Sequence, residues 1–281
     1  MNTARTTDPR PSSPRQATGA RLSAESITCD LNTKIIGRSV LCYQRIESTN
    51  DIAARLATEG TPEGTLVIAE EQTKGRGRFG RRWQAPRGSS LLMSVVFYPA
   101  LLPSQTQRVA MLCSLGLLAG IRIATGLEPR LKWPNDVLIG GKKVAGLLAE
   151  ASVSGSEVSY VAVGMGLNVN LDPAILGDVA LPPSSLAHEL GHPVDRLALL
   201  RHILRETDAR YLHLRQGWSP REEWAANLAT LGQSVSVYLG DEVLTGMAED
   251  VDEDGMLLLR GTDGILHHLP VGDVTSHPPA P

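Results

Sequence analysis

The spacing of hydrophobic residues predicts alternating helices and strands over about the first 230 residues of the chain. Apolar positions recur at helical intervals in some segments and form short runs in others. Helices are predicted at residues 20–36, 51–57, 105–125 and 195–216 and from residue 219 onward. Strands are predicted at residues 40–46, 65–69, 91–98, 130–133, 136–139, 143–150 and 158–169. Gly140-Gly141 is typical of the two-residue turn that joins antiparallel strands.

The pattern changes near each end of the chain. Residues 1–18 are rich in Pro, Ser, Thr and Arg and hold almost no bulky apolar residues, so residues 1–19 are predicted to form a disordered tail. From residue 233, short strands alternate with Gly- and Asp-containing turns, which predicts a small antiparallel barrel. The expected division is therefore a tail at 1–19, a main domain at 20–230 and a barrel at 231–276.

Composition favours a cytoplasmic protein with no membrane or DNA partner. Hydrophobic residues make up 42% and charged residues 20% of the 281 residues, as in ordinary globular proteins. No stretch approaches the length of a membrane span, the apolar helix at 105–125 is assigned to the core, and residues 1–20 do not form a secretory signal. The three cysteines are odd in number and lack metal spacing, which suits a reducing compartment. The net charge of −3 argues against general nucleic-acid binding, so any anion site should be local.

One motif suggests a zinc protease. His188 to His192 reads H-E-L-G-H, which fits H-E-x-x-H, the spacing that places two zinc ligands on one face of a helix. That geometry needs an unbroken helix, but Gly191 weakens it and Pro193 disfavours helical geometry at His192. A zinc protease is therefore a minor alternative, and no metal ligands are assigned.

Known phosphate loops are incomplete in this chain. Residues 140–144 (G-G-K-K-V) lack the hydroxyl of a P-loop, and Gly164-Met165-Gly166 lacks the third glycine of a dinucleotide fingerprint. A bound nucleotide would therefore be held mainly by side chains and irregular loops.

A distinctive series of motifs remains, and its order is more informative than any one member. Ser48-Thr49-Asn50 precedes a helix, and Gln72 follows a buried strand. The rest of the series is G-R-G-R-F-G-R-R-W at 75–83, K-W-P-N-D at 132–136, G-G-K-K-V-A-G at 140–146 and V-G-M-G-L-N-V-N at 163–170. From about residue 38 to residue 275, the sequence closely resembles the biotin protein ligases, and the motifs at 75–83 and 132–136 are the most specific.

The resemblance implies a fold and an activity. The implied fold is α+β, with a mixed, mainly antiparallel sheet flanked by helices (the class II synthetase-like catalytic domain of biotin and lipoate ligases) and a C-terminal SH3-like barrel. The implied reaction uses ATP, biotin and Mg²⁺ to form biotinyl-5′-AMP with release of pyrophosphate. It then transfers biotin to a lysine of a biotin carboxyl carrier protein domain. The segment before residue 38 is too short for a helix-turn-helix domain, so DNA binding is not expected, while monomer and homodimer stay as alternatives.

The resemblance also implies roles for individual residues. Biotin-binding residues are Ser48, Thr49, Asn50, Gln72, Arg76, Gly77, Arg78, Lys143 and Gly146. Residues for ATP and the adenylate are Arg78, Arg81, Trp83, Lys132 and Asn168, with Trp83 against the adenine. The implied catalytic residues are Lys143, Arg78 and Asp136; Asp136 is expected either to position magnesium or to accept a proton from the attacking lysine. Residues 75–83 are expected to order over the ligand and to be disordered without it.

Two further alternatives stay open from the sequence. A lipoate ligase shares the fold and the adenylation chemistry, and the full motifs at 75–83 and 132–136 favour biotin over lipoate. A non-catalytic nucleic-acid binder built on the same basic loop would be expected to have a basic domain, which the net charge of −3 does not support.

Overall fold

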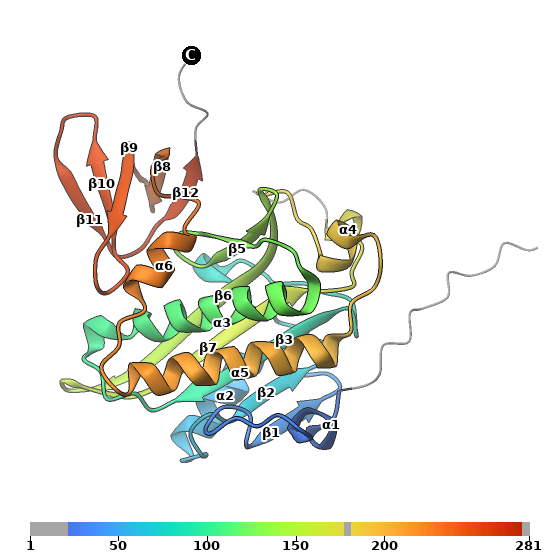
Figure 1. Cartoon of the computed structure of the whole chain (residues 1–281). Coiled ribbons are helices and arrows are strands. Elements are labelled where there is room, and N and C mark those ends of the chain that lie inside the picture. Colours follow the sequence, from blue (N-terminus) through green and yellow to red (C-terminus); the bar gives the residue numbers. More distant parts are fainter. Residues whose placement is uncertain (1–21, 177–180, 277–281) are drawn as a thin grey trace, which may run out of the picture.

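The computed structural model describes residues 22–176 and 181–276 and builds them around two β-sheets (Figure 1). The larger sheet has seven strands in the order β1-β2-β3-β7-β6-β5-β4. Only the β1–β2 pair is parallel, so the predicted mixed and mainly antiparallel sheet is confirmed. Its strands are β1 (Val40–Tyr43), β2 (Leu66–Ala69), β3 (Ser90–Phe97), β4 (Arg130–Lys132), β5 (Asp136–Ile139), β6 (Lys142–Ser154) and β7 (Glu157–Asn168). The predicted tail at residues 1–19 lies outside the described residues.

Helices cover both faces of this sheet. Helices α3 (Gln107–Thr125) and α5 (Arg196–Leu214) lie side by side across one face (Figure 1). Strand β3 alternates between two cores: Val95 joins the main core with these two helices, whereas Val96 packs with α2 (Thr49–Thr58). Helix α2 therefore covers the opposite face, and the site described below lies on its side of the sheet.

The segment predicted as one helix at 20–36 is mostly irregular over its described part, residues 22–36. Only α1 (Ala24–Thr28) is helical, and Asp30 and Asn32 then adopt left-handed conformations with φ of 54° and 57°. The carboxylate of Asp208 on α5 accepts hydrogen bonds from the backbone N–H groups of residues 34–36, at 2.8–2.9 Å. The prediction of a long helix was wrong because this distant carboxylate supplies backbone partners that a helix would otherwise provide.

The apolar helix at the centre of the chain belongs to the core. Residues Pro103–Thr125 combine the 3₁₀ turn η2 (Pro103–Gln105) with α3, and their most apolar 18-residue window has a mean hydropathy of 1.5, high enough for a membrane span. The statement that no stretch approaches such a span was therefore wrong. However, 67% of the most apolar window is buried inside the protein, and α3 packs on α5 and on the sheet. The assignment of this helix to the core is confirmed.

The C-terminal segment forms a separate five-stranded antiparallel sheet in the order β11-β10-β9-β8-β12 (Figure 1). The buried Trp133 joins it to the larger domain, since its indole N–H donates to the carbonyl of Gly255 at 2.9 Å. The strands are β8 (Ser234–Leu239), β9 (Glu242–Val251), β10 (Leu257–Gly261), β11 (Leu266–Leu269) and β12 (Asp273–Ser276). The remaining elements are α4 (Leu186–Leu190), α6 (Arg221–Asn227), η1 (Arg78–Gly80) and η3 (Pro173–Leu176).

A buried ion pair fixes the point where the chain leaves β2 for the arginine-rich loop. Arg196 on α5 and Glu70 approach to 2.8 Å, and their side chains are only 5% and 8% exposed. We expect Glu70→Gln to lower the free energy of unfolding by about 3 kcal/mol, because it leaves the Arg196 charge buried without a counter-charge. Urea unfolding of the variant measures this loss.

The neighbouring residue supplies the control. Glu71 pairs with Arg45, whose side chain is 66% exposed, so Glu71→Gln should cost less than about 1 kcal/mol. Equal losses in the two variants would show that the buried pair has no special role in stability.

Candidate active site

A single cavity of about 840 Å³ collects the predicted site residues. Its wall is built from the start of α2, the β2–β3 loop, strands β4 to β7 and residues of the C-terminal sheet, among them Tyr238 and Asp273. All fourteen residues predicted from the motifs line it: Ser48, Thr49, Asn50, Gln72, Arg76, Gly77, Arg78, Arg81, Trp83, Lys132, Asp136, Lys143, Gly146 and Asn168. The motifs, which are spread over more than a hundred residues of sequence, thus meet at one place.

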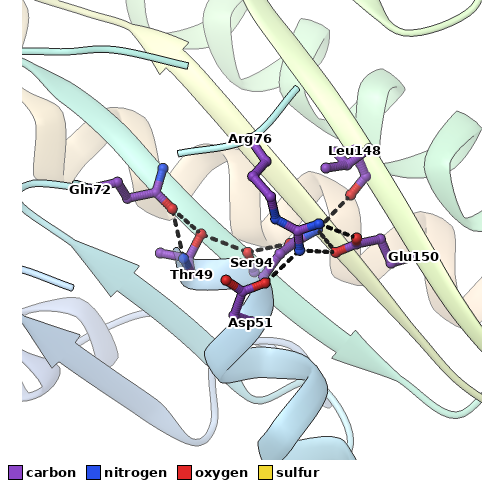
Figure 2. A network of polar contacts seen from close by, with 8 residues as sticks. Thr49, Asp51, Gln72, Arg76, Ser94, Leu148 and Glu150 are labelled. Carbon is purple, nitrogen blue, oxygen red and sulfur yellow. Dashed lines mark hydrogen bonds and ion pairs between the residues drawn. The ribbon is translucent and has the colours of Figure 1, made fainter. Parts of the chain in front are cut away.

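At one end of the cavity, Gln72 replaces the expected helix cap. Ser48 is the N-cap residue of α2, but its side chain makes no capping hydrogen bond. Instead Gln72 Oε1 accepts from the backbone N–H of Thr49 at 2.7 Å and from its hydroxyl at 3.0 Å (Figure 2). This contact fixes the amide of Gln72 with its nitrogen pointing away from Thr49. The side chains of Ser48 and Gln72 both line the cavity, so the Ser48 hydroxyl and the Gln72 amide nitrogen can form hydrogen bonds with a ligand.

Asn50 is held entirely by the protein. Its side-chain nitrogen donates to the carbonyl of Leu148 at 3.1 Å and to Glu150 at 2.8 Å. Its side-chain oxygen accepts from the hydroxyl of Ser94 at 2.6 Å. Ser94 and Glu150 are not among the residues predicted from the sequence; the only signal is that Ser94 interrupts the apolar run 91–97 and that Glu150 follows the run 144–149, which has no polar side chain.

Three glycines clear space for Asn50 and Trp83 on the α2 face of the sheet. A Cβ at Gly164 would lie 2.5 Å from Asn50, and one at Gly166 would lie 2.5 Å from the Trp83 indole. Gly146, paired with Gly166 on the next strand, would place a Cβ 3.2 Å from Trp83 and 3.4 Å from Lys143. The space beside Gly146, expected to admit a ligand, is thus taken by Trp83 and Lys143, and the ligand would meet those side chains.

Contacts at both ends fix the arginine loop, which we define as residues 75–83. The guanidinium of Arg76 pairs with Glu150 at 2.9 Å and also with Asp51 (Figure 2). Arg78 donates to the carbonyl of Gly272 at 3.2 Å, and Arg81 pairs with Asp273 at the start of β12. The loop is thereby tied to β6 on one side and to the C-terminal sheet on the other.

The centre of the cavity is cationic. The Lys143 Nζ lies 2.6 Å from Asp136 Oδ1 and 5.6 Å from the centre of the Trp83 ring. Six cationic residues and two carboxylates line the cavity of a protein whose net charge is −3: Arg76, Arg78, Arg81, Arg82, Lys132 and Lys143 against Asp136 and Asp273. The cavity therefore concentrates positive charge at one place in the protein.

Partial burial makes these cations receptive to an anionic ligand. Burial lowers the pKa of Lys132, and the negative charge of Asp136 only partly opposes this effect. Burial lowers the pKa of Arg78 in the same way, again against the charge of Asp136. An anion placed among them would offset part of this cost.

Two buried polar atoms of the wall have no protein partner. The indole nitrogen of Trp83 and the side-chain oxygen of Asn168 make no hydrogen bond to any residue of the described segments. The amide nitrogen of Asn168 donates to the carbonyl of Ser184 at 3.0 Å, which fixes the orientation of the amide. Unpaired buried groups are costly, so this donor and this acceptor indicate where a polar ligand would bind.

The histidine pair that suggested zinc is separated by the end of a helix. Helix α4 ends at Leu190, and Gly191 adopts a left-handed conformation with φ of 78°. His192 therefore lies beyond the helix, while Glu189 pairs with Lys142 at 2.9 Å. Within residues 22–176 and 181–276, no group of three or more His, Cys, Asp or Glu side chains could hold a metal ion. The zinc protease interpretation loses its geometric basis.

Both parts of the chain match models of known families. Residues 42–168 match the biotin/lipoate A/B protein ligase family, and residues 230–275 match the biotin protein ligase C-terminal domain. The first match contains every predicted site residue, and the second covers the C-terminal sheet. The five-stranded sheet is thus the SH3-like domain expected from the sequence.

Similar proteins carry the same assignment over most of the chain. The biotin–[acetyl-CoA-carboxylase] ligase of Paracoccus denitrificans is 39% identical over 230 residues, which cover 78% of this chain and 93% of the relative. The bifunctional ligase/repressor BirA of Bacillus spizizenii is 34% identical over 251 residues, covering 87% of this chain and 76% of the relative. The biotin protein ligase from Aquifex aeolicus in complex with biotin and ATP superposes with a TM-score of 0.70 at 27% identity, covering 85% of this chain and 99% of that one. The chain belongs to the biotin protein ligase family.

Proposed function

We propose that this protein is an ATP-dependent biotin protein ligase. It activates biotin as biotinyl-5′-AMP with release of pyrophosphate and then transfers biotin to a lysine of a biotin carboxyl carrier protein domain. Support comes from the family, whose members include ligases for acetyl-CoA carboxylase, and from the related Aquifex enzyme, which binds biotin and ATP. The main observation is that half-buried cations share one cavity with Ser48, which makes no capping hydrogen bond, and with Trp83 and Asn168, each of which has a buried polar atom without a partner among the described residues.

The two ends of the cavity suit the two substrates. At the α2 end, Ser48 and the amide nitrogen of Gln72 offer hydrogen bonds to the ureido group of biotin. At the other end, the indole of Trp83 and the oxygen of Asn168 suit a purine base, which has both hydrogen-bond donors and acceptors. Lys143, Lys132 and Arg78 lie where the biotin carboxylate and the α-phosphate would meet. Thr49 and Asn50 then shape the biotin end through the hydrogen bonds they make within the protein.

In the first step a biotin carboxylate oxygen attacks the α-phosphorus of ATP. The new bond joins carboxylate oxygen to phosphorus, and the bond between phosphorus and the oxygen that bridges it to the β-phosphate breaks, so that pyrophosphate leaves. Both reactants are anionic, and fixed cations stabilise the charge that gathers in the transition state. Lys143 and Arg78 are the proposed catalytic residues for this step, with Arg81 and Lys132 near the departing phosphates.

In the second step the amine of a carrier lysine attacks the acyl carbon of the adenylate. An amide bond forms, the bond between acyl carbon and phosphate oxygen breaks, and AMP leaves with its electron pair. The amine has an ordinary pKa near ~10.4, so it gives one proton to solvent before the attack and a second as the amide bond forms. Asp136 is the carboxylate beside the reacting centre, and we propose that its first role is to orient Lys143, which it contacts at 2.6 Å.

Several finer statements belong to the same proposal. Mg²⁺ accompanies the ATP phosphates, and its chemistry is to neutralise the triphosphate charge. The catalytic domain extends over residues 20–230 and the SH3-like domain over 231–276. Cytoplasmic location, the absence of DNA and membrane binding and the choice between monomer and homodimer stay predictions.

Labelling of a carrier domain tests the proposed function. Purified protein is incubated with ATP, Mg²⁺, biotin and an apo carrier domain, and the carrier mass is measured. We expect one biotinyl group on one lysine, and none when ATP is omitted. Absence of labelling under conditions in which a known biotin ligase modifies the same carrier would reject the proposal; labelling by lipoate in place of biotin would identify a lipoate ligase.

A further inference from the structure

Glu150 on β6 stands at the junction of the arginine loop and the α2 end of the cavity (Figure 2). Its two carboxylate oxygens accept from the two terminal nitrogens of Arg76, at 2.9 and 3.0 Å, in a bidentate pair. One of these oxygens also accepts from the side-chain nitrogen of Asn50 at 2.8 Å. Glu150 is not among the residues that line the cavity, so it acts on the ligand site only through the side chains it holds.

A continuous chain of hydrogen bonds runs through this junction. From Glu150 it passes to Asn50, whose side-chain oxygen accepts from the Ser94 hydroxyl at 2.6 Å, and the Ser94 oxygen lies 2.8 Å from the Thr49 hydroxyl oxygen. It ends at Gln72, whose side-chain oxygen accepts from Thr49. Gln72 and Arg76 flank the start of the arginine loop, so the same network holds both the biotin end of the cavity and the entry to the loop.

The contacts of Arg76 set it apart from the other cations of the loop. Its guanidinium faces Glu150 and Asp51, whereas Arg78 faces the carbonyl of Gly272 and the amide of Asn135. Partial burial alone would lower the pKa of Arg76, but its hydrogen bonds to Glu150 and the charges of Glu150 and Asp51 outweigh this and raise it. Two carboxylates therefore neutralise the charge of Arg76, whereas Arg78, whose partners are a carbonyl and an amide, keeps its charge for phosphate.

We propose that Glu150 is a positioning residue that holds the arginine loop in its observed position through Arg76 and couples this position to the biotin end of the cavity through Asn50. The inference rests on the proposed function, because the effect is measured in the biotin dependence of carrier labelling. When the pair breaks, the observed loop position is less populated, and the apparent affinity for biotin falls by that fraction. At saturating biotin the ligand itself holds the loop, so the chemical step is little affected.

The test is steady-state biotinylation of a carrier domain by the full chain. We expect Glu150→Gln, which keeps an acceptor for Asn50 but removes the charge, to raise the KM for biotin about tenfold and to change kcat less than about twofold. Glu150→Ala removes both contacts and should raise the KM further. Trypsin should also cut within residues 75–83 several times faster in Glu150→Gln than in the parent protein, with the melting temperature unchanged.

Two further variants make the test specific. Glu157 is an exposed residue at the start of β7 in the same hairpin, so Glu157→Gln is a matched change in charge that should leave KM and cleavage as in the parent. Arg76→Met should raise the KM as Glu150→Gln does, and the double variant should be no worse than Arg76→Met alone. Additive effects, or a Glu150→Gln variant that behaves like Glu157→Gln, would overturn the inference. Failure of the parent protein to biotinylate would instead reject the proposed function.

Discussion

Replacement of Lys143 by alanine is expected to reduce biotinyl-AMP formation at least about a hundredfold. Lys143 is the cation closest to Asp136, and it lies on the cavity wall against Trp83, where the carboxylate and the α-phosphate would approach. Removal of its ammonium group takes away charge stabilisation that grows as the two anions react. The loss should appear in the rate constant of adenylate formation, measured as pyrophosphate released in a single turnover with biotin and ATP.

The adjacent lysine is the control for this variant. Lys142 begins β6 but pairs with Glu189, and it does not line the cavity. Lys142→Ala removes the same charge one residue away and should keep adenylate formation within about threefold of the parent protein, as expected for a partly exposed pair. If both variants lose activity equally, the role of Lys143 is that of general positive charge rather than a specific contact.

Replacement of Gly166 by alanine is the second variant with a large expected effect. The added Cβ would lie 2.5 Å from the Trp83 indole, so the ring must move away from its place between β6, β7 and the cavity. A displacement of about 1 Å at a reacting site can cost about a hundredfold in rate, and we expect a loss of that size in kcat/KM for ATP. Gly146→Ala, whose Cβ would meet the same ring at 3.2 Å, should lose only about threefold.

A double variant separates displacement of Trp83 from general damage. In Trp83→Ala the ring is absent, so adding Gly166→Ala should cost nothing further. Thermal melting of all four variants reports whether the fold is kept. A further loss in the double variant, with the fold intact, would mean that Gly166 matters for a reason other than the space it gives Trp83.

The motifs could be found in the sequence because each one is local. Strand, turn and glycine signals around residues 130–146 predict a hairpin, and its turn has the expected left-handed glycines, Gly140 and Gly141 at φ of 56° and 78°. In the folded chain, all fourteen residues predicted from these motifs line one cavity. Their chemical roles still follow from the family resemblance and from the proposals above.

Features that depend on distant partners could not be predicted in this way. The helix expected at 20–36 is interrupted because Asp208, over 170 residues away, binds its backbone N–H groups. Glu150 and Asp273 look like ordinary strand carboxylates in the sequence, yet they fix the two ends of the arginine loop. Each depends on which surfaces the folded chain brings together, and no local pattern encodes that.

Isotope exchange between pyrophosphate and ATP tests the central claim most directly, because it needs neither a carrier nor a second step. Radiolabelled pyrophosphate, ATP, Mg²⁺ and the full chain are incubated with biotin, with lipoate or with neither. The account predicts label in ATP only when biotin is present, and its loss in Lys143→Ala but not in Lys142→Ala. No biotin-dependent exchange, or equal exchange with lipoate, would contradict a cavity built to join biotin to AMP.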